Sequence, residues 1–210
     1  MRTAFYPGMK HRRETEIKLP ARDRQGVGKG LGGIGFKVFK ARHFECNCLF
    51  DFPDLRLGKS GCLLRLRFAG GEYSLTFKGP LLSARRYANR REIETRVEDG
   101  VLLSELLKNL GLKQVFIYEK YRTIYAAGNR AGFHELPQIA YDETPIGNYL
   151  ELEGPGKWID EVATRLGYSP QDYITSTYLA LYIQKCREEG KKPGNMVFKG
   201  RKSPLGFLAS

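Results

Sequence analysis

Charged and uncharged residues alternate along several segments of this chain, and an alternation with a period of two is typical of β-strands. In RRETEIKLP (12–20), Glu14, Glu16 and Lys18 alternate with uncharged residues, two of which are large and aliphatic. Successive side chains of a strand point to opposite faces. This segment is therefore expected to carry its charges on one face and its apolar residues on the other.

The same alternation recurs in five later segments, each with a mainly apolar opposite face. Their polar faces consist of Arg65 and Arg67 in 62–68, Ser74, Thr76 and Lys78 in 72–79, Arg90, Glu92 and Glu94 in 87–97, Lys120 and Arg122 in 114–127, and Glu151 and Glu153 in 148–153. Two further strands are expected over 43–52 and near 134–142, so about eight strands are expected in all.

Apolar residues at helical spacing predict helices over 102–111, 157–167 and 172–190. The segment 25–35 has some of this spacing but is rich in glycine, so a poor helix or a loop is expected there. Strands interrupted by a few helices predict an α+β domain with a largely antiparallel sheet.

Composition narrows the class of protein. The 210 residues, 41% of them hydrophobic, suffice for one domain over 1–190, and the basic segment 191–210, punctuated by Gly and Pro, is expected to be a flexible tail. The formal net charge of +12 favours an anionic partner, which could be nucleic acid, a phosphorylated metabolite or an acidic membrane surface. No apolar segment has the length of a membrane span or a signal region, so a cytoplasmic protein is expected. The four cysteines lack zinc-site spacing, so no zinc site is expected, and in a cytoplasmic protein their thiols are expected to be reduced and mostly buried.

Two arrangements of the sheet agree with the alternation. An open antiparallel sheet would turn the charged face to water and cover the other face with helices. A sheet closed into a barrel would instead enclose the charges and carry the helices on its apolar exterior. The density of Glu and Arg, sorted by strand, favours a lined interior, but the pattern alone leaves both arrangements open.

A charged interior would have a recognisable chemistry. Its six carboxylates would be Glu14, Glu16, Glu92, Glu94, Glu151 and Glu153, and its seven cations Lys18, Arg65, Arg67, Lys78, Arg90, Lys120 and Arg122. Like charges crowded together repel one another unless a ligand lies between them. Carboxylates without His or Cys suit Mg²⁺ or Mn²⁺, and Arg and Lys suit phosphate oxygens. A polyphosphate together with a divalent metal would satisfy both sets.

These residues resemble the signature of the CYTH superfamily, the triphosphate tunnel metalloenzymes, which include class IV adenylate cyclases and thiamine triphosphatases. The resemblance begins with ETEIK (14–18), which fits the ExExK motif, and runs to about residue 185. The other matching motifs, in order, are LRLR (64–67), TFKG (76–79), RREIE (90–94), EKYR (119–122), DE (142–143) and LELEG (150–154). The resemblance implies an eight-stranded antiparallel β-barrel tunnel with a charged lumen and external helices.

The resemblance also implies roles for individual residues. The acids expected to hold Mg²⁺ or Mn²⁺ are Glu14, Glu16, Glu92, Glu94, Asp142, Glu151 and Glu153. The bases expected to bind the triphosphate are Lys18, Arg65, Arg67, Lys78, Arg90, Lys120 and Arg122, and all of these except Arg90 are also expected to be catalytic.

Two features depart from the family. Its members often have Lys-Ser-Tyr near the start of the last helix, where this chain reads Ser176-Thr177-Tyr178, so a lysine contact to the substrate is missing. The second feature is the glycine-rich segment 25–35, which contains a formal dinucleotide fingerprint, Gly28-x-Gly30-x-x-Gly33. No βαβ unit is expected around it, so the fingerprint is interpreted as a poor helix or loop.

The expected function is divalent-metal-dependent processing of a small-molecule triphosphate. Class IV adenylate cyclase is the leading specific activity and triphosphatase follows closely. The alternative is a non-catalytic sensor of polyphosphate or nucleotide. Nucleic acid ranks third, because no set of stacking aromatic residues accompanies the bases. No membrane partner is expected, and a homodimer stays open.

Overall fold

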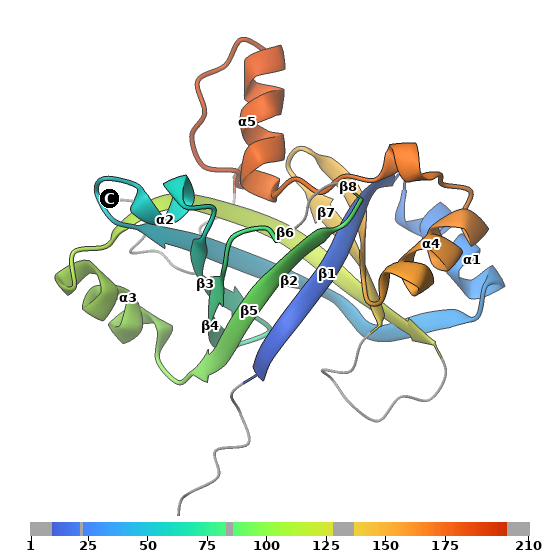
Figure 1. The fold of residues 1–210 in the computed structure, drawn as a ribbon, viewed down its shortest axis with the longest axis horizontal. Helices are drawn as coiled ribbons and strands as arrows, with labels where there is room; N and C mark the ends of the chain where they lie inside the picture. Colours follow the sequence, from blue (N-terminus) through green and yellow to red (C-terminus); the bar gives the residue numbers. More distant parts are fainter. Residues whose placement is uncertain (1–9, 22, 83–85, 128–136, 201–210) are drawn as a thin grey trace, which may run out of the picture.

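Eight antiparallel strands close into a barrel (Figure 1). The structure is a computed structural model, and it describes residues 10–21, 23–82, 86–127 and 137–200. The order of strands around the barrel is β1-β5-β4-β3-β2-β6-β7-β8. The strands are β1 (Lys10–Ala21), β2 (Phe36–Asp51), β3 (Leu63–Ala69), β4 (Glu72–Lys78), β5 (Ala88–Val97), β6 (Lys113–Ala127), β7 (Gln138–Thr144) and β8 (Gly147–Glu153). The sheet is therefore a closed barrel and not the open sheet that the alternation also allowed.

The helices lie outside the barrel, as predicted (Figure 1). They are α1 (Arg24–Gly33), α2 (Arg56–Lys59), α3 (Gly100–Asn109), α4 (Gly156–Arg165) and α5 (Tyr178–Glu188). Ile17 and Leu19 of β1 are fully buried, and they share a cluster with Leu31 of α1 and Ile159 of α4. The apolar strand face predicted from the alternation is therefore the outer face, and the helices shield it from water.

Of the poor helix or loop expected at 25–35, the structure forms a helix, α1. Asp23 caps its first turn by accepting a hydrogen bond from the amide of Gly26 at 2.7 Å, and Leu31 is fully buried against the barrel. Tertiary packing of this kind outweighs the low helix propensity of glycine. The fingerprint beginning at Gly28 lies inside the helix, and β1 and β2 are not neighbours in the barrel, so no dinucleotide-binding turn is present there.

Two other elements have boundaries that differ from the prediction. Strand β2 begins at Phe36, before the expected residue 43, because its first half pairs with the end of β6. The last helix begins at Tyr178, later than the expected residue 172. Ile174 exchanges two backbone hydrogen bonds with Lys18 of β1, at 2.8 and 2.9 Å, and this extended pairing is incompatible with a helix.

The segment after α5, expected from its composition to be a loose tail, contacts the barrel within its described residues 191–200. Met196 is 1% exposed, and its backbone bonds to Ile117 and Glu119 of β6, each at 2.9 Å. Because β7 pairs with β6 only from Tyr121 to Tyr125, the earlier half of β6 has a free edge that this segment occupies.

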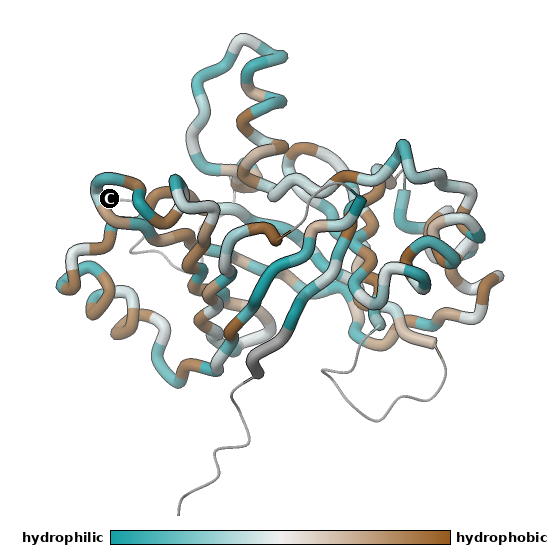
Figure 2. The backbone as a smooth tube through the Cα atoms, viewed as in Figure 1, coloured by the Kyte–Doolittle hydropathy of each residue, from teal (hydrophilic) through white to brown (hydrophobic). Residues whose placement is uncertain are grey.

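Helix α3 has an apolar outer side in addition to its packed side, as the brown colour of this region indicates (Figure 2). Leu102, Leu106 and Leu110 are 54–71% exposed at spacing four. Among the described helices, none combines the length and the apolar composition that a membrane crossing requires.

Candidate functional site

Side chains from strands that are not neighbours contact one another inside the barrel. Lys78 of β4 donates to both carboxylate oxygens of Glu14 of β1, at 2.7 and 2.6 Å, although β5 lies between these strands. Arg65 of β3 likewise reaches the hydroxyl of Tyr118 of β6 at 3.5 Å, across β2. Such contacts form across the concave face of a closed sheet, so these side chains line the lumen.

A continuous chain of ion pairs runs around part of the lumen wall. In order of contact it links, over N···O distances of 2.6 to 3.7 Å, Arg67, Glu45, Lys120, Asp142, Arg122, Glu151, Lys18 and Glu16. Acids and bases alternate along it. Along this chain of ion pairs the expectation of crowded like charges is wrong, because several strand pairs place an acid opposite a base, as Lys18 lies opposite Glu151 and Arg122 opposite Asp142.

Asp142 lies at the centre of this chain and is 0% exposed. Its carboxylate accepts hydrogen bonds from Lys120 at 2.9 Å, from Arg122 at 2.7 and 2.6 Å, and from the hydroxyl of Tyr178 at 2.6 Å. Both oxygens are therefore directed at the bases and the tyrosine. This arrangement favours a role in orienting Lys120 and Arg122, and the assignment of Asp142 as a metal ligand stays a prediction.

The other predicted residues form smaller groups on the same wall. Arg65 donates to the hydroxyl of Thr76 at 3.1 Å, and that hydroxyl donates to Glu94 at 2.7 Å. Glu153 accepts a hydrogen bond from Gln138 at 2.9 Å and lies opposite Glu16 in the ladder between β1 and β8. The structure thus gathers the predicted acids and bases in one lumen, while their roles in binding and catalysis stay predictions.

Charge pairing sets the protonation states in the lumen. Burial alone would raise the pKa of Glu151, but the charges of Arg122 and Lys18 outweigh burial and hold the pKa well below its usual value. The pKa of Glu45 is also well below its usual value, because Arg67 and Lys120 outweigh burial in the same way. Burial would lower the pKa of Arg122, yet the carboxylates around it raise that pKa. These groups are therefore charged at neutral pH.

Three buried donors on the lumen wall have no hydrogen-bond acceptor within the described part of the chain. They are Asn47 Nδ2, Arg65 Nε and Arg90 Nε, on residues that are 0%, 6% and 5% exposed. Among the described residues, two fully buried lumen carboxylate oxygens also lack a hydrogen bond, Glu45 Oε2 and Glu92 Oε2, but each has a cation within 3.7 Å. A buried donor without an acceptor costs free energy. The lumen wall therefore needs additional acceptor oxygens, which a polyphosphate has.

The predicted metal ligands fit Mg²⁺ or Mn²⁺ by their donor chemistry, because all of them are carboxylates. Within the described residues, however, no three Asp, Glu, His or Cys side chains are gathered so that they could hold an ion. Instead, the ammonium of Lys78 lies 2.6 Å from Glu14 and 3.0 Å from Glu92. The ammonium thus lies between two carboxylates, in a position where Mg²⁺ or Mn²⁺ would be expected.

Comparison with known proteins assigns this barrel to a family. The chain matches the CYTH domain over residues 12–178, which is most of its length. It belongs to the CYTH domain family. The match covers all eight strands and ends at the first residue of α5, so the rest of α5 and the segment docked on β6 lie beyond it.

Relatives in this family carry enzyme names. A candidate adenylate cyclase of Methanocaldococcus jannaschii is 29% identical over 178 residues, which cover 80% of this chain and 97% of that protein. Adenylate cyclase CyaB of Aeromonas hydrophila is 25% identical, with 85% and 93% covered. A solved structure of a candidate adenylyl cyclase from Hippeastrum, described as having a dominant triphosphatase activity, shares the fold with a TM-score of 0.58 and 16% identity, with 86% and 97% covered. At the level of the family, the chain is an enzyme.

One departure from the CYTH pattern can be placed in the structure. Ser176, where family members often have lysine, is exposed, and two residues later Tyr178 enters the barrel. The ammonium groups of Lys18 and Lys120 lie 5.3 and 5.1 Å from the centre of the Tyr178 ring. Lysines of the barrel therefore surround this tyrosine on its lumen side.

The sequence reasoning missed four lumen residues: Glu45, Asn47, Tyr118 and Tyr178. Glu45 and Asn47 do show the alternation, opposite the buried Cys46 and Cys48, and could have been found by it. Tyr118 has the same spacing-two relation to Lys120. Tyr178 matches the tyrosine of the family's Lys-Ser-Tyr, but no alternation pointed it into the lumen, because only the packing of α5 against the barrel brings it there.

Proposed function

We propose that this protein is a divalent-metal-dependent enzyme that processes a triphosphate by phosphoryl transfer inside the barrel. The observation that carries the proposal is a set of three buried donors, Asn47 Nδ2, Arg65 Nε and Arg90 Nε, which have no acceptor among the described residues and lie on a wall rich in Arg and Lys. Several acceptor oxygens on one ligand would satisfy these donors together. A triphosphate has such oxygens, and the enzyme names of the relatives agree with it.

The bases of the chain bind and orient this substrate. Arg65 and Arg90 each offer a guanidinium that can hold phosphate oxygens through two parallel hydrogen bonds, whereas Lys120 acts as a point charge. Asp142 fixes Lys120 and Arg122 before the substrate arrives, so little side-chain entropy is lost on binding. Cations aligned in this way stabilise the negative charge that develops on the transferring phosphoryl group.

Mg²⁺ or Mn²⁺ belongs to the proposal as a cofactor. The acids that would hold it are Glu14, Glu16 and Glu92, with Glu94, Glu151 and Glu153 on the same wall. When bound, the ion supplies positive charge to the phosphate oxygens. Because the ammonium of Lys78 lies between Glu14 and Glu92, this lysine would compete with the ion for the two carboxylates.

Two reactions fit the same lumen. In a cyclase, the 3′-hydroxyl oxygen of ATP forms a bond to the α-phosphorus, the bond to the bridging oxygen breaks, and pyrophosphate leaves. In a triphosphatase, water attacks the terminal phosphorus, the bond to the bridging oxygen breaks, the diphosphate part leaves and the attacked group becomes inorganic phosphate. We rank adenylate cyclase first because two relatives carry that name, and triphosphatase close behind because the Hippeastrum structure shows that one fold accommodates both descriptions.

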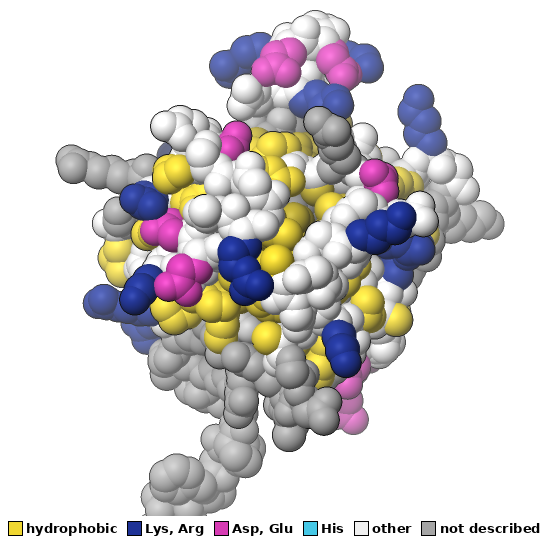
Figure 3. All heavy atoms as spheres, turned by 90° about the vertical axis from the view of Figure 1, so that its right-hand side faces the viewer, with side chains coloured by type: hydrophobic (Ala, Val, Ile, Leu, Met, Phe, Trp, Pro, Cys, Tyr) yellow, Lys and Arg dark blue, Asp and Glu magenta, His cyan; other side chains and the backbone are white. Residues whose placement is uncertain are grey.

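Two alternatives belong to other classes. A sensor would bind polyphosphate or nucleotide in the lumen without turnover. Nucleic acid would need a basic stripe on the surface. On the described surface visible in Figure 3, Lys and Arg side chains occur singly or in small groups among apolar and acidic ones and form no continuous stripe, which does not favour a nucleic-acid interface on that face.

Product analysis distinguishes these possibilities. ATP, tripolyphosphate and thiamine triphosphate are incubated with the protein and Mg²⁺ or Mn²⁺, and cyclic AMP, pyrophosphate and phosphate are measured. A cyclase yields cyclic AMP and pyrophosphate in equal amounts, a triphosphatase yields phosphate, and a sensor binds without product. Arg65→Ala should abolish turnover, whereas Arg165→Ala on the exposed side of α4 removes the same charge and should not. Turnover that survives Arg65→Ala unchanged would contradict the lumen as the active site.

A further inference from the structure

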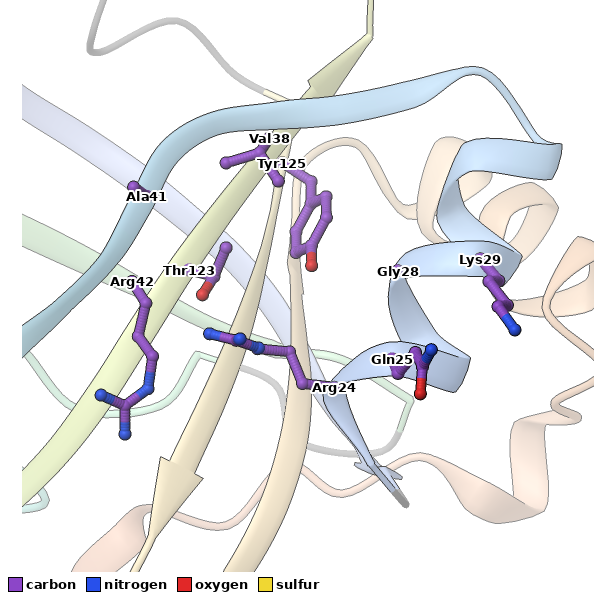
Figure 4. Close-up of a pocket in the computed structure, with 9 residues that line it drawn as sticks. All are labelled: Arg24, Gln25, Gly28, Lys29, Val38, Ala41, Arg42, Thr123 and Tyr125. Atoms are coloured by element: carbon purple, nitrogen blue, oxygen red, sulfur yellow. The ribbon is translucent and has the colours of Figure 1, made fainter.

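A second polar site lies on the outer side of the barrel, away from the lumen. A hollow of about 610 Å³ opens between α1, the first half of β2 and the end of β6 (Figure 4). Its position follows from the pairing of β2 with β6, which shifts register between Val38 and Lys40 and again between Lys40 and His43. These irregularities bend β2 away from regular pairing, as β-bulges do. Thr123 faces this hollow, whereas its neighbour Arg122 faces the lumen.

The lining of the hollow is basic. Arg24, Lys29 and Arg42 contribute to it, and none of the nine residues that line it is acidic. Arg24 has no carboxylate partner in the described part of the chain. Arg42 is held by Glu143, with Nε 2.7 Å from the carboxylate, and by the ring of Tyr121, whose centre lies 3.4 Å from the guanidinium. Among the described residues, therefore, this space is bordered by one guanidinium without a carboxylate partner, that of Arg24, and by one held in place, that of Arg42.

A buried hydroxyl without a partner also faces this space. Thr123 is 3% exposed, and its Oγ1 has no hydrogen bond to any described residue. Figure 4 shows Arg24 reaching from α1 toward Thr123, with Tyr125 beside it and Lys29 pointing away. Burial raises the pKa of Tyr125, so this hydroxyl keeps its proton and can donate a hydrogen bond.

The glycine-rich sequence of α1 explains why the hollow is open. A Cβ at Gly28 would have only the hydroxyl of Tyr125 near it, at 3.7 Å, so the glycine leaves the helix surface bare toward β6. Val38 and Ala41 give the opposite rim an apolar part. The hollow thus combines cationic and hydroxyl donors with apolar surface, and its volume is within the range of small-molecule sites.

We propose that this hollow binds a small molecule that carries a phosphate monoester, separately from the substrate in the lumen. The phosphate oxygens would accept from Arg24 and from the hydroxyls of Thr123 and Tyr125, which a carboxylate with two oxygens could satisfy less fully. The organic part would lie against Val38 and the Tyr125 ring. This site does not depend on the proposed function, because it shares no side chain with the lumen.

The test uses phenyl phosphate as the probe and amide chemical-shift mapping of the full chain, with EDTA present to remove metal. Binding should shift the amides of Gly28, Thr123 and Tyr125, and phenol should not reproduce the shifts. Arg24→Ala should weaken this binding at least tenfold, whereas the control Arg165→Ala on α4 should change it less than twofold. Shifts confined to lumen residues, or equal affinities of the two variants, would overturn the proposal.

Thr123→Val separates a binding role from a structural one. The substitution keeps the shape of the side chain and removes a hydroxyl that has no described partner, so the melting temperature should stay the same or rise. The affinity for phenyl phosphate should nevertheless fall several-fold. An unchanged affinity in this variant would exclude Thr123 from the site and contradict the proposal.

Discussion

Replacement of Asp142 by asparagine tests the organisation of the lumen directly. The substitution keeps the size of a side chain that is 0% exposed but removes the charge that Lys120 and Arg122 share. Removing one partner of a buried ion pair costs about 3 to 5 kcal/mol. In the variant each cation keeps a second acidic partner: Glu45 lies 3.5 Å from Lys120, and Glu151 lies 2.9 Å from Arg122. We therefore expect a loss in the free energy of unfolding at the low end of this range, about 3 kcal/mol.

Thermal unfolding measures this loss. For a chain of this size, about 3 kcal/mol lowers the melting temperature by about 6 to 12 °C. Saturating tripolyphosphate should narrow the difference from the native protein, because its oxygens replace the lost carboxylate near Lys120 and Arg122. The matched control is Asp160→Asn, whose carboxylate also accepts from an arginine and from two tyrosines but is 30% exposed, and which should cost less than about 1 kcal/mol. This reasoning would be refuted if Asp142→Asn left the melting temperature unchanged. It would also be refuted if tripolyphosphate did not reduce the difference in melting temperature between the variant and the native protein.

Three further outcomes are expected. The pKa of Glu151 in the folded protein is lower than its unfolded value of about 4.3, so its contribution to the free energy of unfolding is complete above about pH 4.3 and is lost as the pH falls through the folded pKa. Glu151→Gln should therefore make the free energy of unfolding less dependent on pH below about pH 5. An unaltered pH dependence would contradict the pairing of Glu151 with Arg122 and Lys18. Tripolyphosphate with Mn²⁺ at a hundredfold excess over Kd should raise the free energy of unfolding, measured by calorimetry, by about 2.7 kcal/mol. The double variant Arg65→Ala with Arg67→Ala should lose most of this stabilisation. An equal stabilisation by AMP would mean that the lumen recognises a feature other than a triphosphate. Met196→Ala should lower the free energy of unfolding, measured in urea, by about 2 to 5 kcal/mol, since Met196 is buried against β6. Val197→Ala, at an exposed position, serves as the control. Similar small losses in both variants would show that the segment after α5 does not pack against β6.

Much of the candidate site could be predicted from the sequence because strand geometry is local. The period of two fixes which residues share a face, so Glu14, Glu16 and Lys18 had to lie together whichever way the sheet curved. The same rule would have found Glu45 and Asn47. It could not by itself distinguish an open sheet from a closed barrel, because closure depends on pairing between strands that are far apart in the chain.

The sequence by itself therefore determined most of the strands, the composition of each strand face and the helices that the structure shows as α3 and α4. Only the tertiary structure decided which charges neutralise each other, because register between distant strands places Lys18 opposite Glu151. It also decided that a glycine-rich segment forms α1, because burial of Leu31 against the barrel outweighs the backbone entropy of its glycines. The entry of Tyr178 into the lumen has the same kind of cause: its position depends on where α5 packs, and long-range packing leaves no periodic trace in the sequence.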